Sequence, residues 1–555
     1  MTTTPAPALV EPRPPAEGPA AVRGGAGVVA WAVLVVLTAV VWLGLVRLGW
    51  AFLDRQLDWR YVAEQSRPGL PWWYRMAGVW AGMEGSLLLF TGIVGGVAVV
   101  ATRRAPVAVT GAAVVTVGAL AAIDLGLASP FRRLDLPAVG GFGMNPILEH
   151  PAMTIHPPLL YLGLAAAGGA AVATARVVAG DGAAASASSA RRWHLVTLAA
   201  LTAAMTLGGA WSYLEQGWGG YWAWDPVENT SLVVWLAALV ALHVAGTRGR
   251  GAVVAGFAPW VLALAGAILV RSGATPSIHG FAEQPGVGRA LLALTVLTVV
   301  ATAVAVARTP PATPTGASRA DRQGRDVTVV LVVAATVVVV AGSVFPVLAA
   351  VGDDRDRLVR GEFFSRTVGP LAFVAVPFVA GRLRRWDGAS TIAHAGFLVL
   401  VVGVAASTFD RVATVPIPAG ATLPAAGVDW RNDGVAVVDG PRPGTDAVEA
   451  TLGSDGDAYR PRIVVYPERG GRLAEVAARP GWWTDTLVVL ERAADDGGVV
   501  VTVHRRHGMV FVWLGAMVMT AAAVSRAAAL RPTRRTSCPD TPRRPPKRKS
   551  VAFTS

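Results

Sequence analysis

Cysteine and charged residues are both scarce in this chain of 555 residues. A single cysteine, Cys538, excludes a disulfide within the chain and a CxxC pair for thiol exchange or covalent cofactor attachment. Charged residues make up 15% of the chain and hydrophobic residues 53%, which excludes an ordinary soluble protein of this size. The composition therefore predicts a polytopic membrane protein.

The net charge of +13 does not indicate nucleic acid as a partner. The basic residues form short clusters between apolar runs, such as Arg103-Arg104 and Arg191-Arg192, and a further cluster fills the tail at 530–555. Such clusters are typical of the cytoplasmic side of a membrane protein. All of them fall on one side of the predicted spans, so both termini are expected in the cytoplasm.

Twelve apolar stretches are long enough to cross a membrane, which takes about 20 residues for a helix. Residues 1–26 are rich in Pro and Ala and predict a disordered cytoplasmic arm. The next run is too long for the core of a signal peptide and predicts a retained first helix. Eleven spans are expected within 27–409 and the last at 508–529; the boundaries are 27–49, 79–101, 105–128, 157–178, 194–211, 231–247, 252–271, 288–307, 327–351, 367–383, 391–409 and 508–529.

The long connection at 410–507 differs from the rest of the chain. It contains short alternating apolar runs, including RIVVYPE and DTLVVLE, that are broken by Gly, Pro and Asp. This pattern predicts β-strands. The expected fold is thus an all-α polytopic membrane protein of about 12 transmembrane helices, with a small external β domain between the last two.

Residues 211–235 read WSYLEQGWGGYWAWDPVENTSLVVW and carry the densest aromatic cluster of the chain. One interpretation is an interfacial belt, in which Trp and Tyr rings lie at the membrane surface. A belt needs only one or two rings per helix end, however, and glycines are interleaved here. We favour a platform for a large planar apolar ligand. Its rings are Trp211, Tyr213, Trp218, Tyr221, Trp222 and Trp224.

WGGYWAWDPVEN resembles the tryptophan-rich WWD signature of the CcmF family of cytochrome c biogenesis proteins, which handle haem. Other segments resemble CcmF segments in the family's order, and the resemblance runs from about residue 58 to the last span. Three features depart from what the resemblance leads us to expect: a further helix is usual before the span at 27–49, a further helix pair is usual where RLRRWDGAST leads directly into the span at 391–409, and Met83 stands where a histidine is usual. The segments are YRMAGVWAGMEGSLLLF, NPILEHPAMTIHPPLLYLG, LVRSGATPSIHGFA, IAHAGFLVLVVGVA and GMVFVWLGAMVMTAAAVSR.

Two of the eight histidines, His243 and His394, lie inside predicted spans, while His194 is the first residue of the span at 194–211 on its inner side. At 1.5 Å per residue, His243 is expected ~18 Å below the outer face and His394 roughly 5 Å above the inner face. Within the error of the boundaries they share the inner half of a ~30 Å core. Two neutral imidazoles that face each other can ligate a b-type haem; the alternative for each is a hydrogen-bonded core histidine.

A second pair, His156 and His279, falls at outer helix ends on the side of the aromatic segment. In CcmF the histidines at all four matching positions are haem ligands, so the resemblance implies two sites: a resident haem b on His243 and His394, and a transient haem on this second pair. Arg271 is expected at the same outer rim, either as a snorkelling arginine or as the partner of a haem propionate.

The resemblance implies a haem lyase component in the bacterial cytoplasmic membrane. Such a component receives haem from the chaperone CcmE and joins it to the CxxCH thiols of apocytochrome c, with CcmH-type and CcmI-type subunits as partners and a quinol as candidate electron donor. Here Trp218, Trp222, Trp224 and Asp225 would present the edge of the haem, while Asp225 and Glu228 could also cap a helix. The alternatives are a haem exporter or receptor, a paralogue that serves nitrite reductase, and a secondary transporter.

Overall fold

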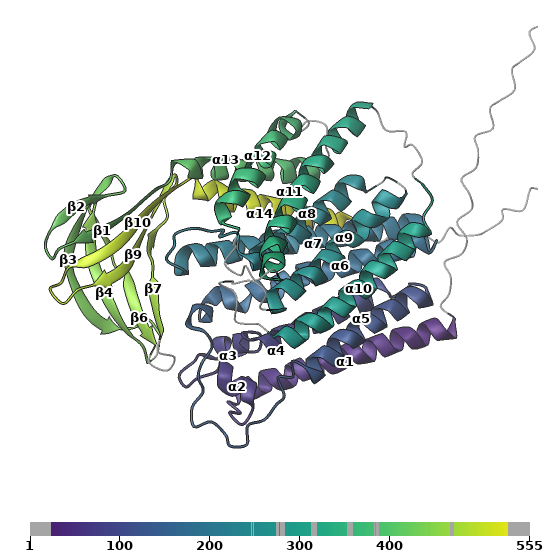
Figure 1. Cartoon of the computed structure of the whole chain (residues 1–555), viewed down its shortest axis with the longest axis horizontal. Helices are drawn as coiled ribbons and strands as arrows, with labels where there is room; N and C mark the ends of the chain where they lie inside the picture. Colours follow the sequence, from purple (N-terminus) through teal and green to yellow (C-terminus); the bar gives the residue numbers. More distant parts are fainter. Residues whose placement is uncertain are drawn as a thin grey trace, which may run out of the picture.

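A bundle of long helices carries a β domain at one end in the computed structural model (Figure 1). The structure describes residues 24–245, 247, 249–272, 277, 284–311, 319–351, 359–381, 383, 388–442, 444–466 and 471–530. Nearly all of the predicted arm and tail lies outside these residues, and so do Cys538 and His279.

Within the described residues, 12 helices are long and apolar enough to cross a membrane. They reproduce the predicted spans, although α7 is 33 residues long and extends well beyond the expected 194–211. These helices are α1 (Gly25–Leu53), α4 (Met83–Ala101), α5 (Val107–Gly126), α6 (His156–Val178), α7 (Ala183–Glu215), α8 (Pro226–Val244), α9 (Arg250–Ser272), α10 (Pro285–Ala307), α11 (Arg319–Val351), α12 (Gly361–Ala380), α13 (Gly388–Ala406) and α14 (Met509–Ala529). Two short helices, α2 (Arg60–Gln65) and α3 (Trp72–Gly78), were not predicted.

Small residues bring α6 and α7 close together in the middle of the bundle. A Cβ added at Gly163 would lie 2.6 Å from the Leu201 side chain, and one at Gly169 would lie 2.7 Å from the Trp193 ring. Close approach of this kind is how membrane helices gain packing energy, since lipid gives no hydrophobic drive for their association. The tight α6–α7 pair fixes where the N-terminal end of α6 and the C-terminal end of α7 meet.

The residues between α13 and α14 form two antiparallel sheets, which confirms the predicted β domain. One sheet has the order β1-β10-β9-β8, and the other has the order β2-β3-β4-β6-β7 with β5 beside β4. Trp430 and Val501 are fully buried between the sheets. The strands are β1 (Arg411–Ile417), β2 (Thr422–Ala425), β3 (Val428–Asp439), β4 (Asp446–Ser454), β5 (Asp457–Tyr459), β6 (Arg462–Tyr466), β7 (Gly471–Glu475), β8 (Ala477–Arg479), β9 (Thr484–Ala493) and β10 (Val499–His507).

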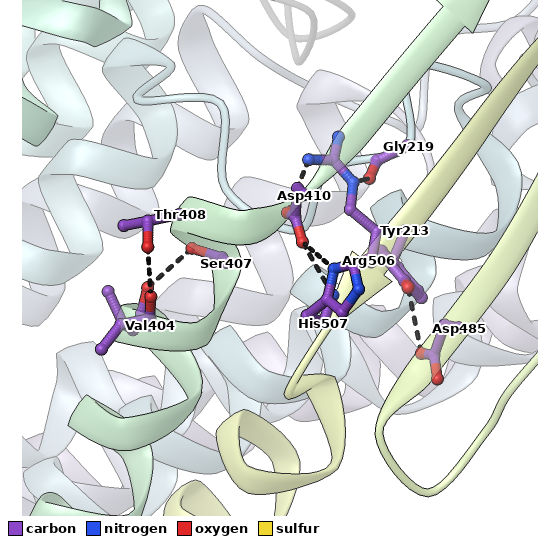
Figure 2. Close-up of polar contacts among 10 residues, drawn as sticks. Tyr213, Gly219, Val404, Ser407, Thr408, Asp410, Asp485, Arg506 and His507 are labelled. Carbon is purple, nitrogen blue, oxygen red and sulfur yellow. Dashed lines mark hydrogen bonds and ion pairs between the residues drawn. The ribbon is translucent and has the colours of Figure 1, made fainter. Parts of the chain in front are cut away.

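Polar contacts hold the β domain against the aromatic segment (Figure 2). Asp410, which follows α13, accepts a hydrogen bond from the His507 backbone N–H (2.7 Å) and pairs with Arg506 (2.9 Å). Arg506 also donates to the Gly219 carbonyl (2.6 Å), and the Tyr213 hydroxyl donates to Asp485 (3.0 Å). We call this end of the helical bundle the β-domain face.

Candidate functional site

Glycines bend the aromatic segment where side chains would collide. Gly217 and Gly219 have φ angles of +73° and +68°, which L side chains rarely adopt. A Cβ at Gly219 would lie 2.5 Å from the ring of His504, and a Cβ at Gly220 would lie 1.8 Å from the Trp218 ring. The interleaved glycines therefore let the segment pass under Trp218 and against strand β10.

Trp224 is anchored to the helical bundle. Its backbone has a φ of +58°, its ring stacks on Phe364 of α12 (centroids 5.2 Å apart, 14° between planes), and its indole N–H donates to Ser365 (2.8 Å). A left-handed conformation at a bulky residue is strained, so these contacts must hold it in place. One face of the Trp224 ring is thus covered by Phe364.

Trp222 differs from Trp224 in its surroundings. It is half-buried and meets Trp224 edge to face, with centroids 6.0 Å apart. Its indole N–H is buried and finds no hydrogen-bond acceptor among the described residues. A buried donor left without a partner costs about 1–3 kcal/mol. Trp211 shares this feature, but it lies between two histidines, so among Trp218, Trp222 and Trp224 the ring of Trp222 best fits contact with a ligand. Trp218 is 38% exposed.

Asp225 and Glu228 form a capping box at the start of α8, as the sequence predicted. The Asp225 carboxylate accepts from the Val227 backbone N–H (2.8 Å), and the Glu228 carboxylate accepts from that of Asp225 (3.1 Å). Ser277 also donates to Asp225 (2.9 Å). Asp225 is buried at the N-terminus of α8, and its capping bonds fix how the aromatic segment enters this helix.

Trp211 lies between two histidines at the β-domain face. His156, the first residue of α6, meets its ring edge to face, with centroids 6.0 Å apart, and His150 stacks on it at 5.6 Å with 10° between planes. The Nδ1 of His156 donates to the Ala204 carbonyl (2.9 Å). His279 lies outside the described residues, so its pairing with His156 stays a prediction.

His150, in the connection that precedes α6, also belongs to this cluster. Its Nδ1 accepts a hydrogen bond from the Ala152 backbone N–H (3.1 Å), which requires a neutral ring with the proton on Nε2. Burial, together with the positive charge of Arg442, lowers the pKa of His150 to about 4 from the usual 6.5. The Glu215 carboxylate lies 3.7 Å from Nε2, but it also lies 3.7 Å from the guanidinium of Arg442. Its attraction for a protonated His150 is therefore too weak to offset the effect of burial on the pKa.

The lowered pKa of His150 makes folding stability depend on pH. The folded state resists protonation at this site while the unfolded chain accepts it, so stability is complete above pH 6.5 and falls as the pH drops toward about 4. We expect His150→Gln to flatten this decline, measured as the melting temperature of the detergent-solubilised protein between pH 7.5 and 4.5. Equal declines in the two proteins would show that His150 is not the group responsible.

Arg271 is buried at the C-terminal end of α9, with 5% of its surface exposed, so the snorkelling interpretation is wrong. Its guanidinium contacts the Met83 sulfur (2.6 Å) and carbonyl (3.4 Å) and the Ser86 hydroxyl (3.5 Å). The thioether of Met83 thus lies against this cation. A partner of stronger negative charge would suit Arg271 better than a thioether.

His243 and His394 lie together, as the comparison of depths predicted. Their ring centroids are 6.3 Å apart and the rings are nearly perpendicular, at 87°. Each Nδ1–H donates to the backbone carbonyl four residues earlier, Leu239 at 2.8 Å and Ser390 at 2.7 Å. Both rings therefore have a fixed tautomer, in which Nε2 is the atom that can bind a metal.

The two histidine groups occupy opposite ends of the bundle. Asp225 precedes the first residue of α8 and His243 is the last but one, so about 17 residues, or ~26 Å of helix, separate them. The aromatic segment, His156 and His150 share the β-domain face, and the His243–His394 pair lies near the other. Within the described residues, no group of three or more His, Cys, Asp or Glu side chains could hold a metal ion by itself.

Comparison with known proteins identifies the family. Residues 80–274 match the model of the cytochrome C assembly protein family. The chain is 38% identical to CcmF of Pseudomonas aeruginosa over 268 residues, which are 45% of this chain and 41% of that protein. It is 28% identical to the biogenesis protein ccl1 of Rhodobacter capsulatus over 575 aligned positions, covering 85% and 87% of the two chains.

The fold and a longer match agree with this result. A solved structure of the cytochrome c haem lyase CcmF superposes with a TM-score of 0.66 at 21% identity, covering 92% of this chain and 99% of that one, so the fold is shared. The probable cytochrome c-type biogenesis protein NrfE of Escherichia coli is 34% identical over 397 residues, 66% of this chain and 70% of that protein. The chain therefore belongs to the CcmF and NrfE family of cytochrome c-type biogenesis proteins.

Proposed function

We propose that the protein is the haem lyase component of a cytochrome c maturation system, with a resident haem b at one end of the bundle and a site for delivered haem at the other. The observation that carries this proposal is the pairing of His243 with His394 inside the helical bundle. Membership of the CcmF and NrfE family supports cytochrome c maturation as the process in which this histidine pair acts.

The imidazoles of His243 and His394 would hold the iron of a haem in this proposal. Their ring centroids lie 6.3 Å apart, and neutral imidazole is a common haem ligand. The bonds from Nδ1 to backbone carbonyls orient the rings, as is usual for metal-bound histidine. A haem held there supplies one-electron transfer, and the two helices keep both imidazoles neutral and fixed.

The residues of the β-domain face suit delivered haem. His156 is oriented by the Ala204 carbonyl and backed by Trp211, and in this proposal His279 is the second ligand. Trp222, with Trp218 and Trp224 beside it, contacts the macrocycle, while the Asp225 cap fixes the bend that presents these rings. Arg271 is assigned to a haem propionate because its buried guanidinium contacts a thioether, a carbonyl and a hydroxyl, while the carboxylate of Asp124 acts on it only through electrostatic attraction among the described residues.

The chain's contribution to the reaction is orientation and redox control. Haem arrives from the chaperone CcmE, CcmH-type and CcmI-type subunits bring the reduced apocytochrome c, and a quinol supplies electrons to the resident haem. The β-domain face is outside the bacterial cytoplasmic membrane in this proposal, and both termini are in the cytoplasm. The positive-inside distribution of arginine supports this orientation.

The proposal predicts that the protein purified from haem-replete cells carries non-covalent b-type haem. The chain has no CxxCH motif, so any haem on the histidine pairs must be extractable with acid and organic solvent. The measurement is an absorption spectrum with a pyridine haemochrome assay. A preparation without a Soret band would remove the proposed function.

A second candidate is a paralogue that attaches haem to a nitrite reductase. The match to NrfE supports it, at 34% identity over 397 residues, although the match to ccl1 is longer. The two functions share the same sites and differ in the apoprotein served. Neighbouring genes separate them: a haem chaperone gene supports the general system, and a multihaem reductase gene supports the dedicated one.

A further inference from the structure

Two adjacent tryptophans at the tip of the β8–β9 connection take no part in either histidine cluster. Trp482 is 81% exposed and Trp483 is 38% exposed. Pro480 and Gly481 precede them, so the pair lies on a tight loop between Arg479 and Thr484. Two adjacent exposed indoles form a contiguous apolar patch, and such a patch on a folded domain marks a surface that contacts another molecule or a membrane.

The loop is tied to the start of a membrane-spanning helix. The Gly508 backbone N–H donates to the Trp483 carbonyl (2.8 Å), and the Trp483 ring meets Phe511 of α14 edge to face, with centroids 6.1 Å apart. Helix α14 has 21 residues, so it is ~31 Å long, and a bilayer's hydrocarbon core is about 30 Å thick. Its first turn must therefore lie at one membrane boundary, and the loop lies there too.

Neighbouring residues confirm the level of this boundary. Phe409, at the end of the segment that leaves α13, is 69% exposed, and Val510 in the first turn of α14 is 39% exposed. Asp410, next to Phe409, is bonded to His507, so the end of α13 and the start of α14 lie at the same height. Exposed apolar side chains after α13, in α14 and in the β8–β9 loop thus gather at one height.

We propose that Trp482 and Trp483 insert into the headgroup region of the bilayer and anchor the β domain to the lipid surface. Indole has an apolar body and one polar N–H, the combination that favours this zone. The occupant is lipid because the loop is held at the boundary by α14 itself. The β domain would then be held on two sides, by lipid at Trp482 and by the aromatic segment at Arg506.

The test measures the depth of residue 482 in the full chain. Cys538 is the only cysteine, so Trp482→Cys in a Cys538→Ser background accepts a single nitroxide label. The protein is placed in phosphatidylcholine–phosphatidylglycerol bilayers, and collisions of the label with oxygen and with a water-soluble nickel complex are compared. The control is Val437→Cys, 77% exposed on strand β3 of the other sheet.

We expect the label at residue 482 to be several-fold less accessible to nickel, relative to oxygen, than the label at 437. Equal accessibility at both positions, as for a loop that awaits a protein partner in water, would overturn the proposal. The label replaces the indole of Trp482, so a second measurement is made with the indole in place. It is the quenching of tryptophan fluorescence by lipids brominated near the headgroup. Trp482→Phe should lower the quenched fraction, and an unchanged fraction would also overturn the proposal. Neither measurement depends on haem.

Discussion

Replacing His243 or His394 by alanine is expected to remove most of the b-type haem from the purified protein. Each ring is half of a pair with centroids 6.3 Å apart, and neither imidazole can fix the iron on both sides alone. Loss of haem from this site should leave haem binding at the β-domain face intact, because ~26 Å of helix lies between the two sites. The measurement is Soret absorbance per molecule, followed by titration of the apoprotein with haem.

The matched control is His194→Gln, which changes a buried histidine of α7 that belongs to neither pair. This variant should keep its full Soret band. The two alanine variants should still take up added haem at the β-domain face, and His156→Ala should lose that uptake while keeping the resident haem. If His243→Ala emptied only the β-domain face, the assignment of the pairs would be wrong.

The sequence was sufficient to predict the spans and the β domain because both rest on local periodicity. Long apolar runs and alternating short runs are visible without knowing any partner. The pairing of His243 with His394 was also within reach, since the rise of a helix converts sequence position into depth. Helices α2 and α3 were missed because six or seven residues carry too little periodicity to recognise.

Contacts between distant segments could not be predicted. Trp224 stacks on Phe364 and bonds to Ser365, about 140 positions away, and Arg506 bonds to Gly219 across 287 positions. For the same reason Arg271 was left between two interpretations, since its burial depends on how α4 packs against α9. The one local signal of tertiary contact was the run of glycines in the aromatic segment, which marked where other side chains come close.

The structure also separates two roles within the WWD motif. Trp224 stacks on Phe364 and bonds to Ser365, so removing it should loosen α12 and lower the amount of folded protein. Trp222 has no such bond among the described residues and leaves a buried indole N–H without an acceptor. A double substitution would mix the two effects. Trp222→Ala alone is therefore the sharper test of the haem platform.

Trp222→Ala should reduce cytochrome c maturation per molecule while leaving the resident haem on His243 and His394 in place. An aromatic pair contributes about 0.5–1.5 kcal/mol beyond simple burial, so binding of delivered haem should weaken roughly two- to tenfold. Haem-stained cytochrome c is measured against immunodetected protein. The control is Trp50→Ala, which removes a 62% exposed ring from α1. An interfacial belt predicts less protein with normal maturation per molecule in both variants. That result for Trp222→Ala would reject the platform, because a ring that binds haem cannot be removed without loss of maturation.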